Sequence, residues 1–185
     1  MTERGVTLIE LVVVIAVIGI LAIALGFSYV GWQGAYKFEK ETKDLYTDLL
    51  DARARALGQG RDYFFDVPTV TTYRTREDTD GSGTPDAGDV VLPTFPKAVE
   101  YDISTNAGGV LSFRHSGIIE APEIAIQIAN GIPEPAIAIC VSTGSDDVNA
   151  DYDCIEVSQT KISTGKLTTQ ISAGGACDAA NCVAK

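Results

Sequence analysis

Five oxygen-bearing side chains between residues 78 and 89 have the spacing of the ligands in a calcium-binding loop. In "DTDGSGTPDAGD" they fall at positions 1, 3, 5, 9 and 12: Asp78, Asp80, Ser82, Asp86 and Asp89. Gly83 stands at position 6, where such a loop turns sharply, and oxygen atoms are the ligands that Ca²⁺ prefers. Asp89 replaces the usual bidentate glutamate, and no flanking helices are predicted. A solvated acidic turn is the simpler interpretation, and a structural calcium site is the alternative.

A single carboxylate, Glu10, stands in the otherwise apolar N-terminal stretch "GVTLIELVVVIAVIGILA". Residues 11–36 carry no charge, and as a helix they would extend about 39 Å, enough to cross a bilayer core. A carboxylate is costly in lipid, so Glu10 needs a reason. "TLIE" fits a capping box with Thr7 as the N-cap, as expected for a plain membrane anchor. A secretory signal cleaved near residues 22–24 is a further interpretation.

The cysteines all lie in the last quarter of the chain: Cys140, Cys154, Cys177 and Cys182. An even number outside any CxxC pattern, on a chain with an export-type start, predicts disulfides in an oxidising compartment. Three connectivities are compatible with the sequence. Pairing of neighbours, Cys140 with Cys154 and Cys177 with Cys182, closes the shortest loops and is the pairing we predict.

The composition argues against nucleic acid as a partner and against catalysis. The net charge is −11, whereas phosphate binding needs a basic face. His115 is the only histidine in the sequence, and GxSxG, HExxH and phosphate-cradling motifs are absent. We therefore predict that the chain is not an enzyme and that His115 is an ordinary residue at the end of a turn. A membrane-anchored hydrolase remains a minor alternative.

A long helix is predicted to begin at Thr7 and to end near Leu57. Beyond the apolar stretch, residues with helical spacing continue the pattern: Phe38, Leu45, Leu49, Ala52 and Ala56. Gly58 and Gly60 then supply a stop. The second half of this helix is expected to pack one apolar stripe against a globular head.

After Arg61 the composition changes to short β-rich runs separated by turn residues. The runs are "RDYFFDV", "TVTTYRT", "VEYDIS", "GVLSFRH", "EIAIQIA", "AIAICVS", "CIEVSQT" and "KLTTQIS". "EIAIQIA" alternates isoleucine with other residues, as in a half-buried strand, and "SQTKISTGKLTTQ" predicts a hairpin that turns at residues 163–165. Strands that follow one long helix predict an α+β fold, with an antiparallel sheet packed on that helix.

The N-terminal stretch resembles type IV pilins and pseudopilins. The resemblance rests on a short leader that ends in glycine, then one apolar residue, then T-L-I-E and a long apolar run. It implies cleavage by a prepilin peptidase between Gly5 and Val6, methylation of the new amino group of Val6, and a role for Glu10 in assembly. In a helical stack, the Val6 ammonium of a neighbouring subunit can pair with Glu10, so that the charge is tolerated. Val6 stands where the family usually has phenylalanine.

The head resembles the FimT-like and H-type minor pseudopilins, the latter of type II secretion. The similar segments are "DLLDARARAL", "DTDGSGTPDAGDVVL" and "GVLSFRHSGII". Some FimT-like members bind DNA through basic residues near the carboxyl end, but the tail here has one lysine and no arginine, so DNA binding is not expected. The implied function is a structural subunit of a type IV filament, first a minor pseudopilin of a type II secretion-like system. The alternatives are a FimT-like minor pilin, a major pilin and, more distantly, an anchored periplasmic binding domain.

This interpretation divides the chain into a leader (1–5), a transmembrane and filament-core helix (6–30), an amphipathic helix half (31–57) and a β-rich head (61–185). The expected partners are copies of the chain or other pilins and pseudopilins, the prepilin peptidase and the inner-membrane assembly platform. The expected location is the bacterial inner membrane, crossed once, with a periplasmic head, and later a periplasmic or extracellular filament. No cofactor is expected other than the calcium ion discussed above.

Overall fold

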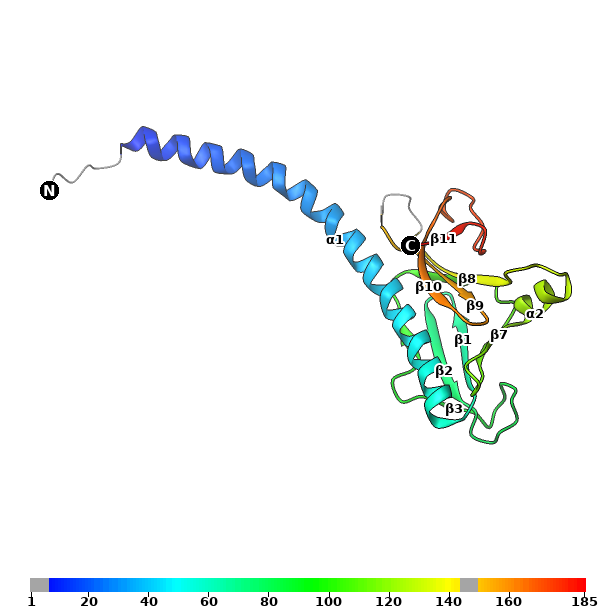
Figure 1. Ribbon diagram of the computed structural model, residues 1–185. Coiled ribbons are helices and arrows are strands. Elements are labelled where there is room, and N and C mark those ends of the chain that lie inside the picture. Colours follow the sequence, from blue (N-terminus) through cyan, green and yellow to red (C-terminus); the bar gives the residue numbers. More distant parts are fainter. Residues whose placement is uncertain (1–6, 144–149) are drawn as a thin grey trace.

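One helix forms the N-terminal third of the protein in a computed structural model that describes residues 7–143 and 150–185, with the side chains of 24–32 left aside. Helix α1 (Leu8–Gln59) extends away from a head that carries all the strands (Figure 1). It ends at Gly60, which has φ 67° and whose N–H donates to the carbonyl of Ala56. This left-handed conformation suits glycine. The predicted helix is confirmed, and it continues two residues beyond Leu57.

The second half of α1 packs one stripe against the head. The stripe repeats at intervals of three and four residues, which places its members on one helix face. Its buried members are Phe38, Thr42, Leu45, Leu49, Ala52 and Ala56. All five apolar residues predicted for this stripe are therefore confirmed. Thr42 is the polar member, and its hydroxyl donates to the Phe38 carbonyl at 3.2 Å, so no hydrogen bond is lost on burial.

The head contains two antiparallel sheets. The first sheet has six strands: five follow the order β3-β2-β1-β6-β7, and the sixth, β4, pairs with β2. Their bounds are β1 (Tyr63–Thr69), β2 (Thr72–Glu77), β3 (Val90–Val91), β4 (Lys97–Ala98), β6 (Leu111–Phe113) and β7 (Ile119–Glu120). The second sheet has the order β11-β10-β9-β8-β5. Its bounds are β5 (Asp102–Thr105), β8 (Ala136–Ser142), β9 (Cys154–Ser158), β10 (Ile162–Leu167) and β11 (Cys182–Ala184).

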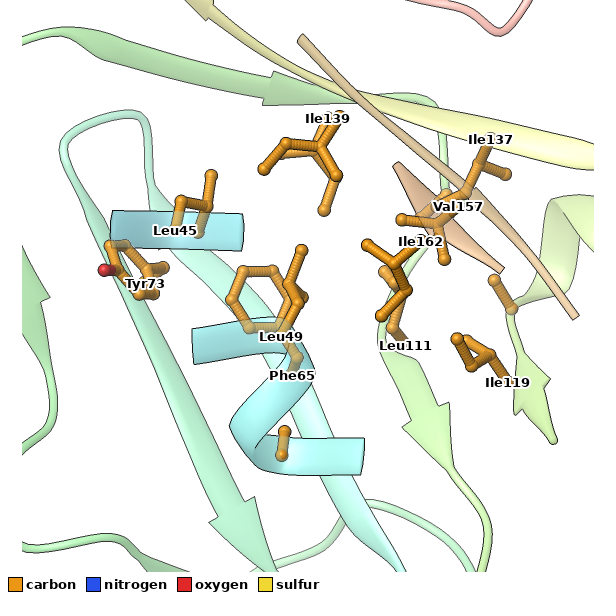
Figure 2. Close-up of a cluster of buried hydrophobic side chains, with 14 of the residues drawn as sticks. Leu45, Leu49, Phe65, Tyr73, Leu111, Ile119, Ile137, Ile139, Val157 and Ile162 are labelled. Atoms are coloured by element: carbon orange, nitrogen blue, oxygen red, sulfur yellow. The ribbon is translucent and has the colours of Figure 1, made fainter. Parts of the chain in front are cut away.

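The main core lies where α1 meets both sheets. Side chains from the helix, from β1 and β2 and from β8, β9 and β10 form one cluster, and Figure 2 shows Leu49 of the helix next to Phe65 of β1. Leu49, Phe65, Ile137 and Ile139 are fully buried. Burial of this apolar surface drives the packing of the helix half onto the head. The predicted α+β architecture is confirmed.

The segment "EIAIQIA" is not a strand but part of helix α2 (Pro122–Ala129). Pro122 occupies the first turn, where its fixed φ and missing N–H suit a helix start, and the acidic Glu123 favours the same end. Of the alternating isoleucines, Ile124 is buried while Ile126 and Ile128 are exposed. The alternation of isoleucines therefore does not mark the buried face of a strand, and the predicted strand is wrong.

The predicted turn at residues 163–165 is also wrong, because these residues lie inside β10. The hairpin between β9 and β10 turns at residues 159–161, where the N–H of Ser158 donates to the Lys161 carbonyl at 2.9 Å. Gly165 meets a close approach of β11, since a Cβ there would lie 2.7 Å from the Val183 carbonyl oxygen. Of the run "KLTTQIS", only Lys166 and Leu167 are in a strand.

Candidate functional sites: the N-terminal helix and the acidic loop

A capping box closes the start of α1. The hydroxyl of Thr7 accepts from the Glu10 N–H at 3.4 Å, while the N–H and the hydroxyl of Thr7 both donate to Glu10 Oε2, at 2.9 and 2.8 Å. The predicted cap is confirmed, and it satisfies donors that a helix start leaves without partners. These bonds use only Oε2, so the second carboxylate oxygen, Oε1, is not used by the cap.

Apolar side chains cover every side of the first turns of α1. Residues 11–15 are all apolar, and five consecutive positions surround a helix that has about 3.6 residues per turn. Each of the large apolar side chains is at least half exposed: Leu8, Ile9, Leu11, Val12, Val13, Val14, Ile15, Val17, Ile18, Ile20, Leu21 and Ile23. A helix that is apolar all round requires an apolar environment, and a surface of this size marks an interaction site.

The predicted cleavage and methylation site, Gly5 and Val6, lies outside the described residues. Among the residues that the structure describes, no helix combines the length and the apolar content that a membrane span requires.

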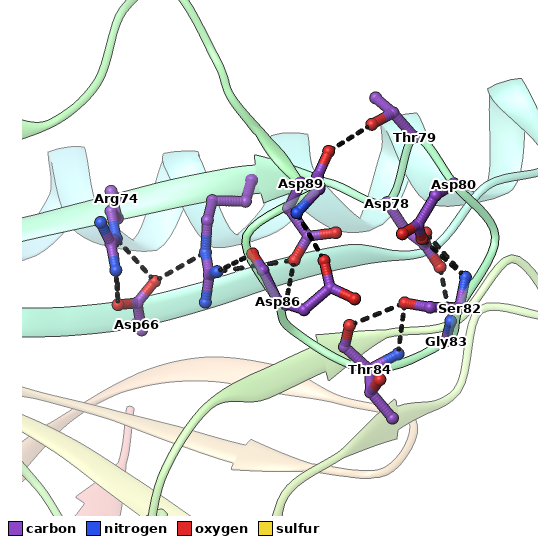
Figure 3. A network of polar contacts seen from close by, with 12 residues as sticks. Asp66, Arg74, Asp78, Thr79, Asp80, Ser82, Gly83, Thr84, Asp86 and Asp89 are labelled. Atoms are coloured by element: carbon purple, nitrogen blue, oxygen red, sulfur yellow. Dashed lines mark hydrogen bonds and ion pairs between the residues drawn. The ribbon is translucent and has the colours of Figure 1, made fainter.

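The acidic segment 78–89 forms the loop between β2 and β3. Strand β2 ends at Glu77, β3 begins at Val90, and these two residues are paired across the strands. The Thr79 hydroxyl donates to the Gly88 carbonyl at 2.7 Å and ties the two sides of the loop together (Figure 3). The loop of the predicted calcium motif is therefore closed at both ends by one antiparallel strand pair.

Three of the five candidate ligands come together inside this loop. One carboxylate oxygen from each of Asp78, Asp80 and Asp89 lies within 4.8 Å of the other two. Two oxygens that bind one Ca²⁺ at up to 2.6 Å can be at most about 5.2 Å apart, so the three fit a shared cation. The other two candidates, Ser82 and Asp86, make hydrogen bonds within the loop. The Ser82 hydroxyl donates to the Thr84 carbonyl at 2.9 Å, and Asp86 Oδ1 accepts from the Gly88 N–H at 2.6 Å.

Backbone N–H groups shape the first half of the loop around Asp78. Asp78 Oδ1 accepts from the N–H groups of Gly81 and Ser82, at 2.7 and 3.2 Å, and Oδ2 accepts from Gly83 at 2.8 Å. Asp80 accepts from the Ser82 N–H at 2.9 Å, and this bond is the main reason that its pKa is lowered. The sequence spacing alone predicted that these residues share one turn, which the structure confirms.

The side chain of Asp89 is fully buried, although the residue as a whole is half-buried. Asp89 Oδ2 accepts from the Asp86 N–H at 2.7 Å and lies 3.5 Å from the Arg76 guanidinium. Asp89 Oδ1 is buried and has no hydrogen-bond partner. Burial raises the pKa of Asp89, against the opposing effects of the Asp86 N–H and Arg76.

A second set of residues, not predicted from the sequence, fastens the loop to the head. Arg114 Nη1 donates to Asp62 Oδ2 and to the Gly83 carbonyl, both at 2.8 Å. The N–H of His115 donates to Asp62 Oδ1 at 2.8 Å, and its ring Nδ1 lies 2.9 Å from the same oxygen. The partners are separated by about 30 to 50 positions in the chain, so no local pattern could reveal them. His115, predicted to be an ordinary turn-end residue, lies in a turn and contacts a buried carboxylate.

The disulfides form, but the predicted connectivity is wrong. Cys140 bonds to Cys177 and Cys154 bonds to Cys182, with Cα–Cα separations of 5.9 and 6.0 Å. Cys140 and Cys154 are direct partners on the adjacent strands β8 and β9. The C-terminal segment, residues 168–184, packs on this part of the sheet and forms a second apolar cluster with it, so each strand cysteine meets a cysteine of that segment.

The long capped helix, its exposed apolar start and the antiparallel head together define the type IV pilin class of proteins. Two family models match: the prokaryotic N-terminal methylation motif over residues 1–26, and the type II transport protein GspH over residues 41–145. The second match covers more than half of the chain, which therefore belongs to the GspH family. No curated protein and no solved structure matches the chain.

Membership of this family defines the function: the chain is a type II secretion minor pseudopilin, a subunit of a type IV-like filament. The family is structural rather than catalytic. It implies assembly with other pseudopilins and processing by a prepilin peptidase.

Proposed function

We propose that the chain is cut between Gly5 and Val6, methylated at Val6, and held in the bacterial inner membrane by residues 6–30. In this arrangement it crosses the membrane once, with the head in the periplasm. It then joins copies of itself or other pseudopilins through α1, with help from the inner-membrane assembly platform. The head serves as a building block and carries no catalytic activity. The observation that carries this proposal is the exposed apolar surface of residues 8–23.

The capped geometry of Glu10 supports a role in contacts between subunits. The cap directs Oε2 toward Thr7 and leaves Oε1 available for a second partner. Cleavage after Gly5 would create an ammonium group at Val6 in every subunit. A neighbouring ammonium beside Glu10 would neutralise its charge in an apolar environment, where an unpaired carboxylate is unfavourable. Such a pair would also fix the axial register between neighbouring helices.

A trio of variants separates the cap from the charge. Glu10→Gln keeps an oxygen that can accept from Thr7 but removes the negative charge, Glu10→Val removes both, and Thr7→Ala weakens the cap but keeps the charge. We expect all three to reach the membrane fraction. Only Thr7→Ala should be recovered with sheared filaments at the wild-type level, and recovery of Glu10→Gln at that level would contradict the pairing.

Mass spectrometry of the N-terminal peptide of the native protein tests the processing step. We expect the mature chain to begin with N-methylated Val6. A mature chain that begins at Met1, or beyond residue 24, would overturn the proposal. A peptide that begins at Val6 without a methyl group would support cleavage and exclude methylation.

A further inference from the structure

We propose that the loop between β2 and β3, residues 78–89, binds one Ca²⁺ ion through the carboxylates of Asp78, Asp80 and Asp89. Asp86 and Ser82, the other two residues of the spacing, lie in the same loop. This site is separate from the assembly surface on the first half of α1, and it does not depend on how the filament assembles.

The strongest indication is a buried carboxylate oxygen without a partner. The Asp89 side chain is fully buried, and its Oδ1 accepts no hydrogen bond. Leaving such an atom unsatisfied is unfavourable, and native structures rarely do so without a reason. Asp89 belongs to the group of three carboxylates whose oxygens lie within 4.8 Å of one another. A cation held by this group would give the buried oxygen a partner.

Gly88 gives a second indication that oxygens converge in the loop. A Cβ at this position would lie 2.8 Å from Asp80 Oδ2 and 3.1 Å from Asp86 Oδ1. Both oxygens therefore lie next to the position that a Cβ atom of residue 88 would occupy, so a residue larger than glycine would crowd them. Figure 3 shows the acidic side chains of the loop, those of Asp78, Asp80, Asp86 and Asp89.

The charges around the loop favour a divalent cation. Four carboxylates lie within twelve residues, and the nearest cationic side chains are held by other partners as well. Arg76 approaches Asp89 through Oδ2 and also contacts Asp66, while Arg114 is shared between Asp62, Glu120 and the Gly83 carbonyl. Neither contact uses Asp89 Oδ1. An all-oxygen set with flexible geometry suits Ca²⁺ better than Mg²⁺, which requires a near-octahedral site with shorter bonds.

The test compares thermal unfolding of the full-length chain in detergent micelles, with CaCl₂ or with a chelator. Loops of this kind in extracellular modules bind at about 10⁻⁴ to 10⁻³ M. At a Ca²⁺ concentration of about one hundred times Kd, we expect the melting temperature to rise by about 5–10 °C. Titration calorimetry on the same sample should give a saturable heat for one site.

Asp80→Asn and Asp89→Asn should remove most of the calcium response. Asp80 is exposed, so its replacement should leave the fold intact even if the Asp89 variant unfolds. Asp102→Asn, at an exposed position on β5 outside the loop, is the matched control and should keep the full response. An unchanged wild-type melting temperature, a wild-type response in Asp80→Asn, or an equal rise with Mg²⁺ would each overturn the proposal.

Discussion

The crossed disulfide connectivity can be tested with two double variants that share Cys140→Ala and differ in which second cysteine is replaced. Cys140→Ala/Cys177→Ala removes one complete bridge, whereas Cys140→Ala/Cys154→Ala removes one partner from each bridge. Alanine is preferred to serine because Cys140 and Cys154 are fully buried, where an unpaired hydroxyl would add a separate penalty. The first variant keeps the Cys154–Cys182 bridge and the second keeps none.

The loop lengths set the size of the effect. The two bridges have sequence separations of 37 and 28 residues. Loop-closure entropy then gives about 3.8 and 3.6 kcal/mol of stabilisation, chiefly by restricting the unfolded chain. The loops overlap between residues 154 and 177, so the two values do not simply add. We expect Cys140→Ala/Cys177→Ala to lose about 3–4 kcal/mol, and the other variant to lose clearly more.

Two measurements on the oxidised proteins give the answer. Urea unfolding followed by circular dichroism gives the loss of stability, and labelling with a maleimide in denaturant counts free thiols. The wild type and Cys140→Ala/Cys177→Ala should show no free thiol, while Cys140→Ala/Cys154→Ala should expose the two left behind, Cys177 and Cys182. The reverse thiol pattern would establish neighbour pairing and refute this reasoning. Two thiols in both variants would establish the third connectivity instead.

Two further predictions concern the head. Leu49→Ala removes a fully buried side chain and should lower the free energy of unfolding by about 2–5 kcal/mol. Leu50→Ala, on the exposed side of the same helical turn, is the control and should lower it far less. Equal losses of unfolding free energy in urea titrations would contradict the packing of α1 on the head. Burial raises the pKa of Asp62, but hydrogen bonds from Arg114 and His115 outweigh burial, so the pKa is lowered overall. The ionised Asp62 therefore stabilises the fold above about pH 4, and this contribution is lost as the pH falls through the lowered pKa. Asp62→Asn should lose about 1.5–3 kcal/mol at neutral pH and show a shallower acid dependence, and an unchanged slope between pH 6 and pH 3 would refute the assignment.

The sequence patterns gave correct predictions for features formed by residues that are only a few positions apart in the chain. The T-x-x-E pattern predicted the cap at Thr7 and Glu10, because a capping box joins residues three apart. The spacing of Phe38, Leu45 and Leu49 predicted the buried stripe, because helical periodicity fixes which residues share a face. The acidic loop was also located correctly, between the two strands that close it.

The errors have physical causes that local patterns do not contain. The alternation in "EIAIQIA" imitates a strand, but Pro122 and the packing of Ile124 favour a helix at that place. Gly165 suggested a turn, whereas its lack of a side chain serves the close approach of β11. Neighbour pairing of the cysteines minimised loop length, but it ignored the C-terminal segment that packs beside β8 and β9.

The sequence by itself determined the class of protein, the long helix, its cap and the spacing of the carboxylates in the acidic loop. Each of these depends on residues that are close together in the chain, so composition and spacing are sufficient. The tertiary structure alone decided the disulfide partners, the burial of Asp89 and the contacts of Arg114 with Asp62 and Gly83. Those features arise only when segments tens of residues apart are brought together by the burial of a shared apolar core.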